Sequence, residues 1–435
     1  VSVLYWCLRN QLVAVNTEML HTQLLVGTAG ALMAGVGAGT HLLSTGMAVA
    51  IAGTGITVAA TLPQLLSVLT PTGVKRIRAY RDDGRAPTRV RKVYTHCRRA
   101  MGAPPMGPVA IFCRAELLAG PCWALFYEAM LAHTSLGRAA KEAIAAGVSD
   151  ANACGFCATA HGGMIDAIAA AEPAAAEDAR LTVPDLIAVR RWATTTRAMA
   201  SGKPGVGDAS PLPFSAAQAP EAVSVVVLFN FVNRLVDLFA DDRVLPQRML
   251  PAPLFRTVWP LLARYLRNSL AIHNEPGASF REAVAASDPS LRSSDTPVER
   301  VEEELPSRLR AALAPNPHIL LAAEAWSRAC ARDVRAALRK ESRDVLRKFV
   351  VAWDGSKGGL STQWATDVAA TSPHEMDRLL LRIALLTIAG PYQVTDADIA
   401  AAISARGEEA VVLVSCFAAA EAAKRIGDGT AACVK

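Results

Sequence analysis

The pattern of apolar and polar positions predicts helices along most of this chain. Alanine-rich runs such as 139–146 and 168–176 favour helix, and β-branched stretches are few beyond about residue 75. A strongly apolar stretch, 222–240, carries one polar stripe with helical spacing: Asn230, Asn233, Arg234 and Asp237. We interpret this stripe as a solvated helix face, with a pocket lining or a subunit contact as the alternative. The sequence therefore predicts an all-α protein.

The N-terminal segment, residues 1–71, shows a different pattern. No Asp, Glu, Lys or Arg lies between Glu18 and Lys75, which leaves enough apolar chain for two membrane crossings of about 20 residues each. Small residues repeat every four positions from Gly27, as they do where membrane helices approach closely. Two interpretations stay open: a membrane hairpin through residues 22–70, or an upstream extension that is not part of the working protein.

The remaining chain divides into three regions. Residues 72–272 and 308–435 carry helical patterns, and the polar, proline-rich stretch 273–307 predicts a linker between them. Aligning Arg138 with Arg378 brings similar residue patterns together, which predicts two tandem related helical domains. The second domain is expected to be degenerate, because it lacks the thiol motif described next.

Composition narrows the function classes and the expected location. The formal charge of +6 is spread over 45 basic and 39 acidic residues, and the sparse aromatic residues are not interleaved with basic clusters. Nucleic acid is therefore not an expected partner. Nine cysteines at scattered spacings do not resemble the disulfide framework of a secreted domain. We expect a cytoplasmic protein, tethered to the inner face of the membrane if the hairpin forms.

The main candidate for chemistry is the motif C-G-F-C-A-T-A-H, which contains Cys154, Cys157 and His161. On a helix these offsets fall on one face, so the three side chains can meet. Gly147, followed by Ser149 and other N-cap residues, predicts a helix stop and a new helix that begins near the cysteines. The start of a helix favours a thiolate, the reactive form of cysteine. A zinc site lacking its fourth ligand and a pair of buried structural cysteines are the alternatives.

Adding Glu142 extends the motif to E-x11-C-x2-C-x3-H, which resembles the alkylhydroperoxidase AhpD-like, or carboxymuconolactone decarboxylase, family. About 23 residues match closely. The resemblance implies an AhpD-like helical bundle, usually a homo-oligomer, that reduces organic hydroperoxides. It implies no bound cofactor and no metal, because an external dithiol such as a lipoyl protein or a thioredoxin-like carrier restores the cysteines.

The resemblance also implies roles for the motif residues. Cys157 would attack the peroxide, Cys154 would resolve the product as a disulfide, and His161 with Glu142 would relay protons. Phe156 is a departure, since redox-active members often have histidine directly before the second cysteine. An ordinary solvated glutamate is the alternative interpretation of Glu142.

Three functions follow from these observations. The first is a thiol-dependent peroxidase or disulfide oxidoreductase. The second is a carboxymuconolactone decarboxylase-type enzyme that acts on lactones, and the retained cysteine pair counts against it. The third is a non-enzymatic, membrane-tethered redox sensor, suggested by the N-terminal segment.

Membrane flotation tests the hairpin. If the hairpin forms, the full chain should float with lipid vesicles, because two apolar crossings anchor it, and a chain that begins at Thr72 should remain in the soluble fraction. If both chains stay soluble, the hairpin is ruled out.

Overall fold

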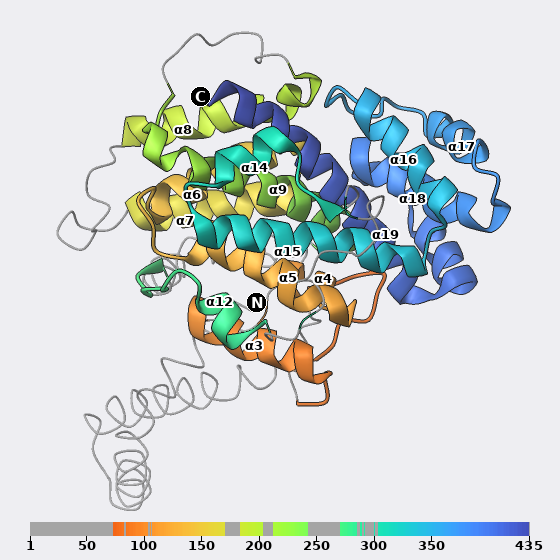
Figure 1. Cartoon of the computed structure of the whole chain (residues 1–435), viewed down its shortest axis with the longest axis horizontal. Coiled ribbons are helices and arrows are strands. Elements are labelled where there is room, and N and C mark those ends of the chain that lie inside the picture. The colour runs from red at the N-terminus through yellow and green to blue at the C-terminus, as the bar shows by residue number, and fades with distance from the viewer. Residues whose placement is uncertain are drawn as a thin grey trace, which may run out of the picture. The chain divides into compact units, whose positions relative to one another are not determined.

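Helices make up the regular structure of this chain in a computed structural model (Figure 1). The structure describes residues 73–434 except 82–83, 103–104, 106, 170–182, 203–211, 242–269, 285–287, 289–290, 292–299 and 301–302. Within these residues the all-α prediction is confirmed, with fourteen α-helices and, besides them, one isolated β-bridge between Val74 and Ala240. All described residues belong to one compact unit formed by Thr72–Asp242 and Leu266–Lys435. The predicted membrane hairpin lies outside the described residues.

The first half of the unit contains the predicted motif. Its α-helices are α3 (Thr88–Met101), α4 (Gly107–Phe112), α5 (Glu116–Phe126), α6 (Arg138–Asn152), α7 (Gly155–Ala169), α8 (Val183–Thr195) and α9 (Ala219–Phe239). Its shorter turns are the π-helical η1 (Tyr127–Leu131) and the 3-10 turns η3 (Thr196–Ser201) and η4 (Ala216–Gln218). The alanine-rich run 139–146 lies inside α6, as its composition predicts.

The second half is equally helical. Its α-helices are α12 (Ala278–Glu282), α14 (Ser307–Leu313), α15 (Pro317–Asp333), α16 (Lys340–Ala352), α17 (Gln363–Ala370), α18 (Glu375–Ala389) and α19 (Asp396–Cys433). Two 3-10 turns, η7 (Val334–Ala336) and η8 (Pro391–Gln393), join them. Thr395 caps α19, and its hydroxyl accepts a hydrogen bond from the Asp398 N–H in a capping box. An N-cap at this position is a prediction that the structure confirms.

Helix α9 forms the centre of the packing. It lies against α6 and α19 and also contacts α4, α14 and α15. The span Ala216–Phe239 is long and apolar enough to cross a membrane, yet 94% of its most apolar window is buried inside the unit. In the described part of the chain α9 is therefore the core helix around which the others pack.

The two halves share one core. Helix α15 lies along α5, and α19 packs against α9, although these pairs are far apart in sequence (Figure 1). The regions assigned to a redox domain and a degenerate domain are thus in direct contact. Their relationship as a tandem repeat stays a prediction.

The helix stop expected at Gly147 is wrong. Gly147 lies inside α6, and α6 passes close to α8 at this point. A Cβ atom on Gly147 would collide with the Arg190 carbonyl oxygen and lie 2.7 Å from the Ala193 Cβ. This glycine is needed for close helix packing and does not end the helix.

Replacing Gly147 with alanine therefore tests the contact between α6 and α8. We expect Gly147→Ala to lower the free energy of unfolding by about 2 kcal/mol, because α8 must move away to make room. Urea denaturation measures the change. Gly162→Ala is the matched control, since a Cβ on Gly162 meets nothing within 4 Å. It should leave stability unchanged or raise it by about 0.5–1 kcal/mol, because alanine is the better helix former. Equal destabilisation by both changes would contradict the packing argument.

Candidate active site

The two cysteines of the motif lie where α6 ends and α7 begins. Ala153 adopts a left-handed conformation with φ of 60°, and its N–H donates to the Asp150 carbonyl at 3.1 Å. The Cys154 N–H donates to the Ser149 carbonyl at 2.9 Å, which completes a Schellman motif. The Cys154 carbonyl then accepts from the Ala158 N–H at 3.0 Å, so Cys154 is the residue directly before α7, in the N-cap position. The predicted location of the cysteines in the first turn of a new helix is confirmed.

The Cys154 and Cys157 side chains are hydrogen-bonded to each other, and the Cys157 N–H also donates to the Cys154 sulfur. Both thiols are buried, with 0% and 2% of their surfaces exposed. The hydrogen bond with Cys157, burial and the nearby negative charge of Asp237 raise the pKa of Cys154 well above its ordinary value. The helix start therefore does not make Cys154 a thiolate, contrary to the expectation for this position.

Glu142 and His161 are in direct contact. The Oε2 atom of Glu142 lies 2.6 Å from Nδ1 of His161, and its Oε1 accepts from Nε of Arg138 at 2.7 Å. Glu142 is fully buried, so its interpretation as a solvated glutamate is wrong. On α7, His161 follows Cys157 by four residues, which places both side chains on one helix face. The His161 ring also packs edge-on against Phe229 of α9, with 4.5 Å between the ring centres.

The charge state of Glu142 follows from these contacts. Burial would raise the pKa of its carboxyl group, but the charges of Arg138 and His161 and their hydrogen bonds hold that pKa below its ordinary value. Glu142 is therefore a carboxylate at neutral pH. With its Nδ1 atom directed at this carboxylate, His161 keeps Nε2 available to accept or donate a proton.

The polar stripe on α9 is buried and is not the solvated face that we expected. Asn230 and Asn233 have no exposed surface. The Asn152 side chain donates to Asn230 Oδ1 at 3.1 Å, and the Ser149 hydroxyl donates to Asn233 Oδ1 at 3.2 Å. The stripe therefore attaches the C-terminal end of α6, and with it the cysteine junction, to the core helix.

Asp237 continues the stripe one turn beyond Asn233, and its negative charge acts on Cys154. Burial raises the pKa of Asp237 to about 6, although Cys154 and positive charges that include Arg234 lower it. Sequence reasoning placed Asp237 on the stripe but gave it no role at the site. The signal was a carboxylate within an otherwise apolar helix.

Arg197, in η3 of the first half, connects this region with the second half of the chain. Its Nη1 atom donates to Asn152 Oδ1 at 2.8 Å, and its Nε and Nη2 atoms donate to the carbonyls of Gly355 at 2.7 Å and Ala389 at 3.0 Å. Its guanidinium also stacks over the Trp353 ring, 5.6 Å from the ring centre. One side chain thus ties the cysteine junction to the second half.

Comparison with known proteins places this chain in a family. Over 348 residues the chain is 31% identical to alkyl hydroperoxide reductase Rv2159c from Mycobacterium tuberculosis (strain ATCC 25618 / H37Rv), a match that covers 79% of this chain and 91% of that relative. The chain belongs to the family of this alkyl hydroperoxide reductase. No protein-family model and no solved structure matches it.

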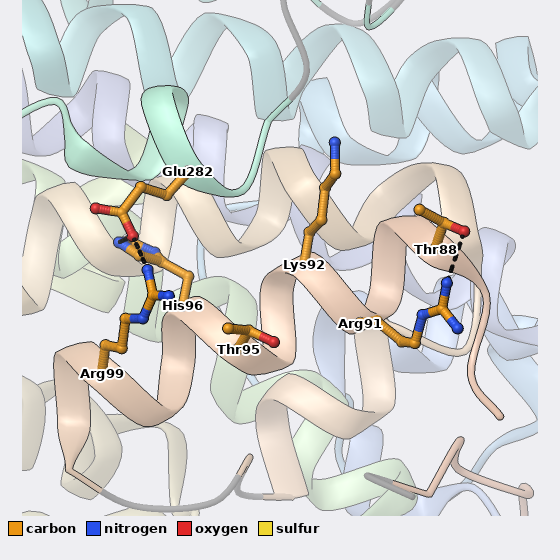
Figure 2. Close-up of a pocket in the computed structure, with 7 residues that line it drawn as sticks. All are labelled: Thr88, Arg91, Lys92, Thr95, His96, Arg99 and Glu282. Carbon is orange, nitrogen blue, oxygen red and sulfur yellow. Dashed lines mark hydrogen bonds and ion pairs between the residues drawn. The ribbon is translucent and has the colours of Figure 1, made fainter. Parts of the chain in front are cut away.

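A pocket of about 490 Å³ in this chain lies apart from the cysteine motif. Its lining comes from α3 and α12: Thr88, Arg91, Lys92, Thr95, His96, Arg99 and Glu282. Figure 2 shows Arg99 meeting Glu282, at 2.9 Å, on one side of the pocket. The orientation of the His96 ring is set by Trp123, whose indole N–H donates to His96 Nδ1 at 2.8 Å. None of the four predicted catalytic residues lines this pocket.

The zinc interpretation of the motif requires a set of clustered ligands. In the described ranges, no group of three or more His, Cys, Asp or Glu side chains is arranged to hold a metal ion. Within the motif, the structure instead pairs His161 with the carboxylate of Glu142.

Removing Arg138 tests how the buried Glu142 charge is held. We expect Arg138→Gln to lower the free energy of unfolding by about 2 kcal/mol at pH 7, because a buried carboxylate loses a charged hydrogen-bond partner. In the wild type the folded-state pKa of Glu142 is below its unfolded value, so this stabilisation is complete above about pH 4.3 and is lost as pH falls through the folded-state pKa.

The difference in unfolding free energy between the two proteins should therefore be largest at neutral pH and shrink in acid. Urea denaturation at a series of pH values measures it. Arg191→Gln is a suitable control, since Arg191 is exposed on α8. A difference that stays constant down to pH 3 would contradict the assigned charge on Glu142.

Proposed function

We propose that this protein is a thiol-dependent peroxidase that reduces organic hydroperoxides through Cys157 and Cys154. Membership in the alkyl hydroperoxide reductase family supports hydroperoxide chemistry in general. The observation that carries the specific proposal is the buried Glu142–His161 pair, 2.6 Å apart, one helical turn from Cys157. Peroxide reduction needs a nucleophilic thiol, a second thiol that resolves it and a group that transfers protons, and a dithiol near a paired carboxylate and imidazole can supply all three.

In the first step the Cys157 sulfur attacks the peroxide, and the O–O bond breaks as a sulfenic acid forms on Cys157. His161 accepts the Cys157 proton at Nε2 and passes it to the departing alkoxide, which leaves as an alcohol. Glu142 stabilises the transient imidazolium through the bond to Nδ1. Phe156 occupies the position before Cys157, so no histidine is present there. His161 is therefore the imidazole that we assign to this relay.

In the second step Cys154 resolves the sulfenic acid. Its sulfur is already hydrogen-bonded to Cys157, so a disulfide can form with little movement of the helix start. The raised pKa of Cys154 supports this division of labour, since a protonated thiol does not compete with Cys157 for the peroxide.

The remaining parts of the proposal concern the reductant, the oligomeric state and the location of the protein. We propose that an external dithiol, such as a lipoyl protein or a thioredoxin-like carrier, reduces the disulfide, with no cofactor bound to the chain. We further propose an AhpD-like homo-oligomer in the cytoplasm, at the inner face of the membrane if residues 22–70 enter it.

Serine substitutions test the cysteine roles. With an organic hydroperoxide and dihydrolipoamide as reductant, we expect Cys157→Ser to abolish peroxide consumption, because the nucleophile is gone. Cys154→Ser should consume one equivalent and leave a sulfenic acid on Cys157 that a dione probe traps. Mass spectrometry of the trapped protein identifies the modified residue.

Cys433→Ser provides a control, because Cys433 is a partly exposed cysteine at the end of α19. It should retain wild-type turnover. The proposal fails if thiol titration shows that both Cys154 and Cys157 are unchanged by hydroperoxide.

A further inference from the structure

The pocket between α3 and α12 is lined almost entirely by side chains that donate hydrogen bonds. Four of them recur every three or four residues along α3 and so share one helix face: Thr88, Lys92, Thr95 and Arg99. Glu282 of α12 is the one carboxylate among the described residues that line the pocket. Every lining side chain is polar or charged, so the pocket suits a polar ligand that is rich in acceptors.

His96 presents a fixed N–H group at the wall of this pocket. Only 4% of its surface is exposed, and its ring packs against Tyr127 with 4.8 Å between the ring centres. Burial lowers the pKa of His96 despite the opposing charge of Glu282, so the ring is neutral at pH 7. The Trp123 indole can only donate, which makes His96 Nδ1 an acceptor and places the single ring proton on Nε2.

The Nε2–H group of His96 has no acceptor among the described residues. Oε2 of Glu282 lies 3.9 Å from Nε2, beyond hydrogen-bond distance, and already accepts from Arg99 at 2.9 Å. Polar groups of buried side chains are ordinarily hydrogen-bonded. An acceptor atom of a ligand in the pocket would complete the hydrogen bonding of this ring.

Two cationic side chains lie on either side of His96 along α3. Lys92 precedes it by one turn, and no hydrogen bond or ion pair joins the Lys92 ammonium to another described residue. Arg99 follows His96 by three residues and uses Nη1 on Glu282, which leaves other N–H groups of its guanidinium for a ligand. With Arg91 included, three cations face one carboxylate in the lining, so a negative ligand is favoured.

We propose that this pocket binds a soluble small molecule that carries a phosphate group, with the phosphate held by Lys92, His96 and Arg99. A phosphate monoester has three terminal oxygens and can accept from all three donors at once, whereas a carboxylate has two oxygens. In Figure 2, Lys92 lies between His96 and Arg99 at one end of the pocket and Arg91 at the other. The volume of about 490 Å³ leaves room for an organic body that extends toward Arg91.

The polar lining also decides between two sources of a phosphate group. It offers no apolar surface to acyl chains, which favours a free phosphate ester over the headgroup of a lipid. The inference concerns binding alone. It does not depend on the peroxidase proposal, since none of Glu142, Cys154, Cys157 and His161 lines the pocket.

NMR of the full chain with ¹⁵N-labelled histidine rings tests the contact with His96. With glycerol 3-phosphate as the probe, we expect the His96 ring-nitrogen signals to shift and saturate, because Nε2–H gains an acceptor. The spectrum of His96→Gln identifies these signals. Acetate at the same concentration should leave them in place. Signals that do not move with glycerol 3-phosphate, or that move equally with acetate, would overturn the proposal.

Calorimetric titration with glycerol 3-phosphate tests the charged residues. We expect Lys92→Gln and Arg99→Gln each to weaken binding about tenfold, because each removes a charged hydrogen-bond donor from an exposed position. Glu282→Gln should tighten binding, since it removes a negative charge beside the phosphate and frees Arg99. This opposite sign distinguishes a specific site from a general loss of stability.

Arg281→Gln is the matched control. Arg281 is an exposed cation of α12 that adjoins Glu282 in sequence but does not line the pocket. Its removal should change the affinity by no more than about twofold, because an exposed charge outside the site is screened by solvent. Weakening equal to that of Lys92→Gln would show diffuse charge attraction and would overturn the site.

Dihexanoyl phosphatidic acid, a short-chain lipid with the same phosphate group, separates the two sources. We expect it to bind no more tightly than glycerol 3-phosphate, because its acyl chains meet a polar lining. Much tighter binding of the lipid, lost in Lys92→Gln, would overturn the assignment of a soluble ligand.

Discussion

The site depends on the burial of one charge. Glu142 has no exposed surface, and an unpaired carboxylate in such a position would cost several kcal/mol. Arg138 supplies one partner from the same helix, but the second, His161, must come from α7. The need to pair Glu142 therefore fixes α7 against α6. Because Cys157 lies one turn before His161, the same pairing also sets the position of the Cys157 thiol.

A second set of buried polar contacts ties this helix pair to the rest of the unit. Buried amide and hydroxyl groups are stable only when paired, and Asn152 is paired on both sides, with Asn230 of α9 and with Arg197. Arg197 in turn donates to carbonyl groups of the second half, and Arg234 does the same through the Ile388 carbonyl at 3.2 Å. Loosening the second half would thus leave Arg197 less firmly held against Asn152, two residues before Cys154. The second half acts as a support for the site even though it contributes no thiol to it.

The sequence was most informative where local rules decide the structure. The thiol motif, the apolar core helix and the Thr395 cap were all predicted, because helix spacing, apolar runs and capping residues act over a few positions. The burial of Glu142 and of the α9 stripe was not predicted, since a polar residue on a helix is ordinarily solvated and the partners that bury it come from distant segments. Gly147 was misinterpreted for a related reason. The same residue type ends helices and permits close helix contacts, and only the position of α8 distinguishes the two.

The helix pair that the predicted repeat aligns with α6 and α7 carries a charged bridge without the thiol motif. Helices α18 and α19 occupy the residues that align with α6 and α7, and Arg382, aligned with Glu142, pairs with Asp398 of α19 at 2.6 Å. A charged pair therefore bridges both helix pairs, although the second has no cysteine at its turn. An arginine–aspartate pair serves as a bridge but exchanges no proton near neutral pH, because arginine stays protonated. A glutamate–histidine pair forms the same kind of bridge with an imidazole, a group that can both accept and donate a proton. In the first half, the contact that holds α6 and α7 together therefore includes a group able to exchange a proton, whereas the contact between α18 and α19 does not.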